Sequence, residues 1–229
     1  MRKGKLIVID GIDGSGKATQ TALLAKRLRK EGYKVRTIDF PRYYDNFFGH
    51  LIGEYLAGSF GDFIKVDPRV ASVLYAADRF ESSSLIRRWL EEGFVVIADR
   101  YVSANQIHQG GKIHSVAKRK EFLKWLDLME YQVFKIPKPD LVIYLDVPFE
   151  VSRGWLQNKI IQRSKKYLRG RRDVAESNLL YLHDSRESAL YLHQSRKNWE
   201  KVSCCQGNVC MLPQEVHEEV FAIVKRRLK

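Results

Sequence analysis

The sequence lacks long hydrophobic runs. No uninterrupted apolar stretch in its 229 residues approaches the length of about 20 residues that a helix needs to cross a bilayer. The N-terminal segment, residues 1–5, contains three basic residues and leads directly into a strand-like pattern, not into a signal segment with a small-residue cleavage site. We therefore expect a cytoplasmic protein with no membrane partner, built as one domain over residues 1–229.

Cysteine is also scarce. The three residues of this type, Cys204, Cys205 and Cys210, lie close together near the C-terminus. An odd number with no second cluster argues against a disulfide framework and against a four-ligand zinc site. We expect these side chains to be buried or idle thiols in a reducing compartment.

Acidic residues are few relative to basic ones, 27 against 40, and the formal net charge is +13. Such an excess suits a polyanionic partner, but charge alone does not distinguish nucleic acid from nucleotide phosphates. The most skewed stretch contains seven basic residues and no acid: Lys159, Arg163, Lys165, Lys166, Arg169, Arg171 and Arg172. We interpret residues 159–176 as a small mobile lid that faces phosphate. The alternative is a solvated charged surface.

The most informative stretch follows the first apolar run, Leu6–Ile9. Gly11, Gly16 and Lys17 have the spacing of the phosphate-binding loop, and a helical pattern follows. Glycines let the backbone N–H groups converge, the helix N-terminus attracts anions, and the lysine adds a mobile cation. The residues predicted to bind ATP are Gly11, Ile12, Asp13, Gly14, Ser15, Gly16, Lys17, Ala18 and Thr19.

The loop departs from its usual pattern at one position. Ala18 stands where a hydroxyl normally binds Mg²⁺, and the first hydroxyl comes one residue later, at Thr19. We expect the ion to be held by Thr19, by a carboxylate such as Asp99 or Asp13, or by water and phosphate oxygens.

Strand and helix patterns alternate along the rest of the chain. Continuous apolar runs predict buried parallel strands that lie between two layers of helices. The sequence therefore predicts a three-layer α/β/α P-loop fold with a five-stranded parallel sheet. The strands after Leu6–Ile9 are expected at Val35–Ile38, Phe94–Ala98, Leu141–Leu145 and Val209–Leu212, and a long helix is expected to end near Trp199. Arg42 and Asp99 follow strands, at the edge where open sheets bind ligands.

These motifs together resemble the thymidylate kinase family of P-loop nucleoside monophosphate kinases, over nearly the whole chain. The resemblance rests on the phosphate loop and on four further segments: Phe40-Pro41-Arg42, residues 74–81 (LYAADRFE), Asp99-Arg100-Tyr101 and residues 103–111 (SANQIHQGG). The loop alone occurs in many nucleotide enzymes, but the combination is specific. The resemblance implies transfer of the γ-phosphoryl group of ATP to dTMP, with Mg²⁺ as cofactor, by a homodimer.

The resemblance also implies roles for single residues around the phosphates. Lys17, Arg42 and Arg100 would neutralise phosphate charge. Asp13 would help hold the 3′-hydroxyl of the sugar, and Asp99 would organise Mg²⁺ or an arginine. The candidate catalytic residues are Asp13, Lys17, Arg42, Asp99, Arg100, Arg169, Arg171 and Arg172.

Around the base and sugar, the resemblance implies that Tyr75 stacks on thymine. Arg79 and Asn105 would contact the edge of the base, while Tyr101 and His108 would crowd the sugar and disfavour ribonucleotides. The candidate substrate-binding residues are Asp13, Arg42, Tyr75, Arg79, Arg100, Tyr101, Asn105, His108 and Gln109.

Two positions depart from the family pattern. His108 lies where many relatives carry tyrosine, and Gly14 lies where some carry arginine. Members that lack the loop arginine place catalytic arginines in the lid, and for this reason Arg169, Arg171 and Arg172 are included above.

Two other functions remain open from the sequence. One is a kinase for another deoxynucleotide or a deoxynucleoside on the same scaffold. The other is a P-loop protein that binds nucleic acid, which predicts basic and aromatic residues interleaved along one face. Here the basic residues concentrate in the 159–172 stretch and at residues 225–229, so we expect no nucleic-acid partner.

Overall fold

The computed structural model describes residues 3–61, 65–148, 150–152, 154–155, 179–207 and 209–228. Its centre is a parallel sheet of five strands in the order β2-β3-β1-β4-β5. The strands are β1 (Lys5–Asp10), β2 (Val35–Asp39), β3 (Val95–Asp99), β4 (Leu141–Asp146) and β5 (Trp199–Ser203). The strand order and the parallel pairing confirm the predicted fold class.

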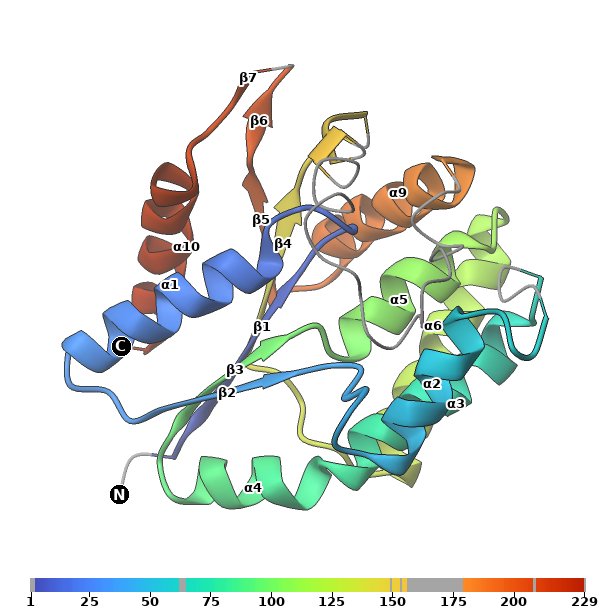
Figure 1. Cartoon of the computed structure of the whole chain (residues 1–229), viewed down its shortest axis with the longest axis horizontal. Coiled ribbons are helices and arrows are strands. Elements are labelled where there is room, and N and C mark those ends of the chain that lie inside the picture. The colour runs from blue at the N-terminus through green and yellow to red at the C-terminus, as the bar shows by residue number, and fades with distance from the viewer. Residues whose placement is uncertain are drawn as a thin grey trace.

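Helices cover both faces of the sheet (Figure 1). Helices α1 and α10 lie on one face, and α5 and α9 lie on the other with the remaining helices around them. The helical elements are α1 (Lys17–Lys30), α2 (Phe47–Leu56), α3 (Pro68–Glu81), α4 (Ser83–Glu91), α5 (Val102–Gly111), α6 (Val116–Leu128), the π-helical turn η1 (Met129–Val133), α9 (Leu179–Ser195) and α10 (Pro213–Leu228).

The two cores follow from side-chain alternation along the strands. Ile7 and Ile9 of β1 pack with α1 and α10, whereas Leu6 and Val8 of the same strand pack toward α5, α6 and α9. Because both faces of the central strands are buried, these strands have no polar alternation, as parallel sheets require. This layering places the carboxyl ends of the strands along one edge of the molecule.

The start of α3 shows how local sequence fixes an element. The Asp67 carboxylate accepts hydrogen bonds from the backbone N–H groups of Arg69 (2.8 Å) and Val70 (3.4 Å). Pro68 occupies the first turn, where its missing N–H costs nothing. The Asp-Pro pair therefore fixes the start of the helix that carries Tyr75 and Arg79.

The prediction for the fifth strand is wrong. Residues Trp199–Ser203 form β5 beside β4, and the preceding helix ends at Ser195. Val209–Cys210 is instead β7, which pairs antiparallel with β6 (Cys205–Gln206) outside the main sheet. Strand β5 lies at the sheet edge, where Trp199 and Val202 are buried on opposite faces and Glu200 and Lys201 lie between them. It therefore lacks the continuous apolar run on which the prediction relied.

The expectation of idle thiols also needs correction. Cys205 and Cys210 form a disulfide that closes the β6–β7 hairpin, while Cys204 is buried and not disulfide-bonded. Spacing could not reveal the pairing, because two cysteines five residues apart can bond only where the chain turns back between them.

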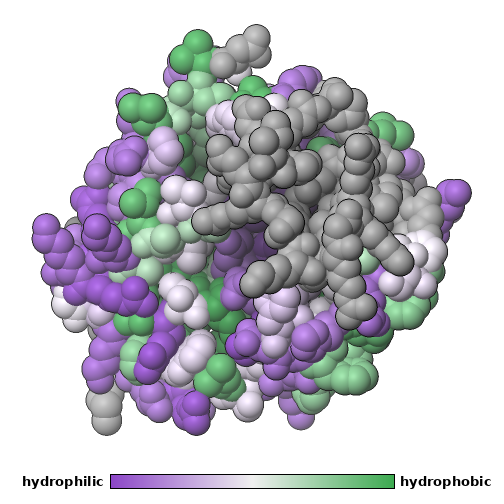
Figure 2. Space-filling model, viewed as in Figure 1, coloured by the Kyte–Doolittle hydropathy of each residue, from purple (hydrophilic) through white to green (hydrophobic). Residues whose placement is uncertain are grey.

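On the face shown in Figure 2, hydrophilic side chains cover much of the described surface, and hydrophobic ones lie scattered among them. Scattered exposure of this kind is normal and marks no binding site. Within the described residues, none of the helices combines the length and apolar character needed to cross a membrane. The expected lid, residues 159–176, lies outside the described residues.

Candidate active site at the carboxyl edge of the sheet

Aspartates end four neighbouring strands at one edge. Asp10, Asp39, Asp99 and Asp146 are the last residues of β1 to β4. Open parallel sheets bind ligands at this carboxyl edge. Asp10 is fully buried, and its carboxylate accepts hydrogen bonds from the Ser103 hydroxyl (2.5 Å) and the Gly11 N–H (2.8 Å). Burial raises the pKa of Asp10, against the opposing charge of Arg100.

The phosphate loop joins β1 to α1 directly above Asp10. Gly14 and Gly16 have φ angles of 82° and 89°, in the left-handed region that glycine adopts without strain. Gly16 is also the N-cap of α1. The loop therefore leads directly into the helix, and the N–H groups at the start of α1 face the loop. The Ser15 hydroxyl is buried without a hydrogen-bond partner among the described residues, which fits a loop shaped to receive a polar ligand.

Lys17 lies inside this loop. Its ammonium group donates to the carbonyls of Gly11 (3.0 Å) and Ile12 (2.9 Å). Burial, together with the positive charge of Arg100, lowers the pKa of Lys17 to about 8. Phosphate oxygens could replace the two carbonyls as acceptors and would restore the preference for the charged form.

Arg100 follows β3 in a conformation that is unusual for a residue with a side chain. Its φ of 66° lies in the left-handed region, and its N–H donates to the Ile9 carbonyl at 3.0 Å. Strain of this kind concentrates at functional sites. The guanidinium forms a salt bridge with Asp13 and approaches the Nε2 atom of His108 at 2.9 Å. Burial disfavours the charged form of Arg100. The negative charges of Asp13, Asp10 and Asp99 outweigh that effect and raise the pKa of Arg100.

His108 links Arg100 to helix α9. A guanidinium only donates, so Nε2 of His108 must accept and its Nδ1 must carry the proton. That proton points to the Ser185 hydroxyl, 3.2 Å away, and this hydroxyl donates to the Tyr181 carbonyl at 2.7 Å. The imidazole also stacks on the Tyr181 ring, with centroids 5.7 Å apart. Burial and the charge of Arg100 lower the pKa of His108 to about 3, which agrees with a neutral ring.

Arg42 is held from several sides after β2. Its backbone N–H donates to Asp78 at 3.1 Å, and its guanidinium contacts the Ser82 hydroxyl at 3.3 Å and Asp45 at 3.1 Å. Helix α2 passes very close by: a Cβ atom on Gly49 would lie only 1.9 Å from the Arg42 carbonyl oxygen. Glycine at this position therefore lets α2 pack against the turn that carries Arg42.

A third hydrophobic cluster lines the side of the site away from the sheet. Ile12 of the loop packs with Ile52 and Leu56 of α2 and with Tyr181 of α9, and Tyr75 packs against them. Tyr75 is half-buried, so its ring borders the cluster and retains an exposed side. The cluster thus joins the phosphate loop to the helix on which a planar base could stack.

Arg79 and Asn105 are buried together behind Tyr75. Each is only 2% exposed, and both contact the fully buried carboxylate of Glu130 on η1. Gln109 lies one turn after Asn105 on α5. Its Oε1 atom is buried without a partner among the described residues. The structure thus brings together the residues that were expected to surround the base.

Tyr101 does not join them. Its side chain is fully buried in the main core, its ring packs against Phe40 with centroids 5.7 Å apart, and its hydroxyl donates to the Pro137 carbonyl at 3.0 Å. The expectation that Tyr101 crowds the sugar is therefore replaced by a packing role. The apolar ring and its single polar group are both satisfied inside the protein.

The fit to Mg²⁺ depends mainly on Asp99. Carboxylate oxygen is a ligand that Mg²⁺ prefers, and burial raises the pKa of Asp99 while Lys17 and Arg100 oppose that effect. Thr19 is exposed on the first turn of α1. Within the described residues, no three His, Cys, Asp or Glu side chains lie close enough to hold an ion. The donor set suits an ion that brings phosphate and water ligands with it.

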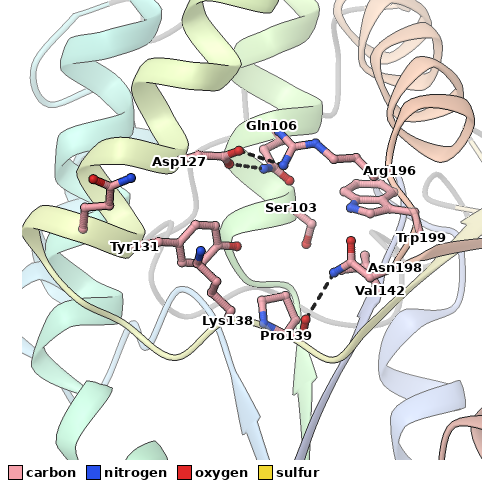
Figure 3. A pocket seen from close by; sticks show the side chains of 11 residues that line it. Ser103, Gln106, Asp127, Tyr131, Lys138, Pro139, Val142, Arg196, Asn198 and Trp199 are labelled. Carbon is pink, nitrogen blue, oxygen red and sulfur yellow. Dashed lines mark hydrogen bonds and ion pairs between the residues drawn. The ribbon is translucent and has the colours of Figure 1, made fainter.

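A separate cavity of about 350 Å³ lies between α5, α6 and the amino ends of β4 and β5. Figure 3 shows Arg196 and Gln106 both directed at Asp127 across it, at 2.7 Å and 3.0 Å. Asn198 donates to the Pro139 carbonyl at 3.1 Å. These polar groups satisfy one another, and the amino edge of a parallel sheet is not where such folds bind ligands. We therefore place the candidate active site at the opposite edge.

Sequence reasoning missed several residues that shape the site. Glu130, Asp78 and Ser185 hold Arg79, Arg42 and His108. Glu130 and Ser185 belong to no motif, and Asp78 lies inside the 74–81 segment but was assigned no role. Asp10 could have been found, because an aspartate at the end of a buried apolar strand marks the ligand-binding edge. The lid arginines Arg169, Arg171 and Arg172 lie outside the described residues.

The strand order and the glycine loop with its buried lysine define a P-loop nucleotide kinase. Residues 9–203 match the sequence pattern of the family described as thymidylate kinase. A "Probable thymidylate kinase" from Pyrococcus abyssi is 34% identical over 99% of this chain and 98% of its own length. The thymidylate kinase of Mycobacterium tuberculosis is 30% identical over 85% of this chain and 87% of its own. The chain belongs to the thymidylate kinase family.

A solved structure of thymidylate kinase from Candida albicans supports the fold. It matches with a TM-score of 0.71 and 23% identity, over 98% of this chain and 92% of that one. Family membership gives the reaction: a phosphotransferase that converts dTMP to dTDP.

Proposed function

We propose that the enzyme transfers the γ-phosphoryl group of ATP to dTMP at the carboxyl edge of the sheet, in the presence of Mg²⁺. Support comes from the meeting of Lys17, Arg100 and Asp13 at this edge. Phosphoryl transfer asks mainly for positioning and for cations around the phosphate oxygens. The buried Lys17, the partly buried Arg100 and the glycine loop are suited to that task.

The loop would bind the donor. Residues Gly11 to Thr19 present backbone N–H groups, and Lys17 would exchange its two carbonyl partners for phosphate oxygens. Mg²⁺, when bound, neutralises charge between the phosphates, and Asp99 is the carboxylate that we assign to its sphere. Because Ala18 offers no hydroxyl, Thr19 is the weaker candidate.

Two arginines would bind the acceptor phosphate. Arg42 and Arg100 can each form a pair of parallel hydrogen bonds to phosphate oxygens. In the described structure Arg100 is paired with Asp13. A bound phosphate would share the guanidinium with Asp13, and that carboxylate would accept from the 3′-hydroxyl of the sugar. Arg169, Arg171 and Arg172 are assigned to the transferred group from sequence alone.

The base would lie against the third hydrophobic cluster. Tyr75 would stack on it, a contact worth about 1–3 kcal/mol for an aromatic side chain and a base. Arg79 and Asn105 would contact its hydrogen-bonding edge, and Gln109 would border it. His108 would lie beside the sugar while it holds Arg100. The cytoplasmic location and the homodimer belong to this proposal as well.

The decisive experiment is a panel of nucleoside monophosphates with ATP as donor. We expect ADP release with dTMP and much less with dCMP, dAMP, dGMP or thymidine. Lys17→Ala should abolish transfer and leave the thermal unfolding midpoint near that of the wild type. If the enzyme phosphorylates another deoxynucleotide or a nucleoside faster than dTMP, that compound replaces dTMP as the proposed acceptor. Tight, salt-dependent retention on single-stranded DNA without ADP release would favour nucleic-acid binding.

A further inference from the structure

Glu130 is a buried carboxylate that the motifs do not explain. It lies on the π-helical turn η1 at the end of α6 and is completely shielded from solvent. Single π-helical turns are rare and frequently occur at functional sites. A buried carboxylate is costly unless it is paired and hydrogen-bonded. Its partners therefore indicate why the protein keeps it.

The partners are the two side chains assigned to the edge of the base. Glu130 Oε2 accepts from Arg79 Nε at 2.9 Å, and Oε1 accepts from Arg79 Nη2 and from Asn105 Nδ2, the latter at 3.2 Å. Arg79 also donates to the Tyr101 carbonyl at 3.3 Å. A guanidinium bonded through two nitrogens to one carboxylate has a fixed plane.

The same carboxylate determines which way the Asn105 amide points. Asn105 Nδ2 donates to the Ser72 carbonyl at 3.1 Å as well as to Glu130. Both of these groups only accept hydrogen bonds, so the NH₂ group must face them. The Asn105 Oδ1 atom is thereby left to accept a hydrogen bond from a ligand.

We propose that Glu130 is the positioning residue for base selection, because it holds Arg79 as a donor and Asn105 as an acceptor toward the base. This inference rests on the proposed function. Thymine offers an acceptor at O4 and a donor at N3, whereas cytosine offers a donor at N4 and an acceptor at N3. A donor from Arg79 and an acceptor from Asn105 match thymine and oppose cytosine. Glu130 acts through these two side chains without touching the base.

The test compares two substrates that differ only at this edge, dTMP and 5-methyl-dCMP. In Glu130→Gln one carboxylate oxygen becomes an NH₂ group that cannot accept from Arg79 or Asn105. The guanidinium therefore loses its two-point pairing, and the Asn105 amide is held mainly by the Ser72 carbonyl. We expect the ratio of kcat/KM for dTMP to that for 5-methyl-dCMP to fall on the order of tenfold or more. The KM for ATP should stay near the wild-type value. The ratio for dTMP over dUMP should not change, because the methyl group is not read by these residues.

A ratio measured on one preparation does not depend on the fraction of folded enzyme, so lost stability does not imitate the effect. Glu130→Asp provides a second variant. It keeps the negative charge beside Arg79, but its carboxylate is one methylene shorter and cannot span both partners. It should show the same loss of selectivity.

Asp127→Asn is the matched control. Asp127 lies three residues before Glu130 and also accepts from an arginine and an amide, Arg196 and Gln106, but at the cavity on the other edge of the sheet. This variant should lose stability and keep the wild-type ratio. The proposal is overturned by an unchanged ratio in a folded Glu130 variant, or by an equal change in Asp127→Asn. A wild-type enzyme that prefers another acceptor over dTMP would instead overturn the proposed function.

Discussion

Lys17 is a buried cation whose neighbours make its charge sensitive to pH. Burial and the charge of Arg100 lower its pKa, and the acids Asp13, Asp99 and Asp10 only partly restore it. Below the lowered pKa the ammonium is charged and can bind phosphate, while above it the neutral amine cannot.

The activity of the free enzyme toward ATP should therefore fall at alkaline pH. With the pKa of Lys17 at about 8, we expect kcat/KM for ATP to decrease as pH rises through that value, since this parameter reports the free enzyme. The measurement is a pH–rate profile at saturating dTMP. The neutral His108, with its pKa lowered to about 3, should add no inflection between neutral and mildly acidic pH. A profile that stays flat well above pH 8 would contradict the assignment of Lys17.

Asp99 and Thr19 are the two side chains proposed to bind Mg²⁺, and they differ in burial. Asp99 is half-buried at the end of β3, whereas the Thr19 side chain is exposed on α1. We expect Asp99→Asn to raise the Mg²⁺ concentration for half-maximal activity by about tenfold, the lower end of the loss seen when supporting groups of a metal site are removed. Thr19→Ala should have a smaller effect. A Mg²⁺ titration at constant free ATP decides this, and unchanged curves for both variants would show that protein oxygens do not hold the ion.

At the scale of elements, the packing of α2 depends on Gly49, a glycine that belongs to no motif. A methyl group at Gly49 would meet the Arg42 carbonyl oxygen at 1.9 Å and its carbon at 2.4 Å. Backbone atoms cannot swing away as a side chain can, so the helix and the Arg42 turn would have to separate.

Gly49→Ala should therefore weaken both the fold and the acceptor site. We expect a loss of about 1–3 kcal/mol in the free energy of unfolding, typical for overpacking, together with a raised KM for dTMP. Gly154→Ala is the control, because no atom of the described residues lies within 4 Å of a Cβ atom there. Denaturant unfolding and steady-state kinetics measure the two effects. Equal behaviour of the two variants would count against the close packing of α2.

The strands differ in how well they could be predicted from the sequence. Strands β1, β3 and β4 were predictable because each is a continuous apolar run between two helical layers. Strand β2 was predictable because its residues alternate in the manner of a strand and Pro41 ends it. Strand β5 was not, because Glu200 and Lys201 interrupt the pattern at the sheet edge. The motifs indicated the phosphate loop and the candidate base-side residues Arg79 and Asn105, since these residue types recur at fixed spacing.

The contacts between motifs were beyond the sequence. Glu130 reaches Arg79 across 51 residues and Ser185 reaches His108 across 77. In a helical pattern each of these is simply a polar position, and its partner is set by the packing of α3 against η1 and of α5 against α9. Tyr101 is the opposite case. It belongs to a motif, but its side chain packs in the core.

At the scale of the whole molecule, an apolar stripe lies on the outer face of α3. Val70, Val73 and Phe80 are exposed by 64%, 44% and 51%, and their spacing places them on one side of the helix. Leu128 and Val133 are also exposed, and the Phe80 ring packs against Phe134 with centroids 5.3 Å apart. Because these residues are aligned along one face, the stripe differs from the scattered apolar residues of Figure 2. We expect the proposed homodimer to bury this stripe in its interface.

A charge placed on this stripe should separate the subunits. In a two-fold dimer the same face meets itself, so one substitution introduces two like charges into an apolar interface. We expect the wild type to sediment as a dimer and Val73→Asp to shift to the monomer at the same micromolar concentration. Val209→Asp is the matched control, because Val209 is 77% exposed on β7 and lies away from the stripe. The Tyr75 and Arg79 side chains extend from the same helix, so loss of the partner should also raise the KM for dTMP. A monomeric wild type, or a Val73→Asp variant that stays dimeric, would remove α3 from the interface.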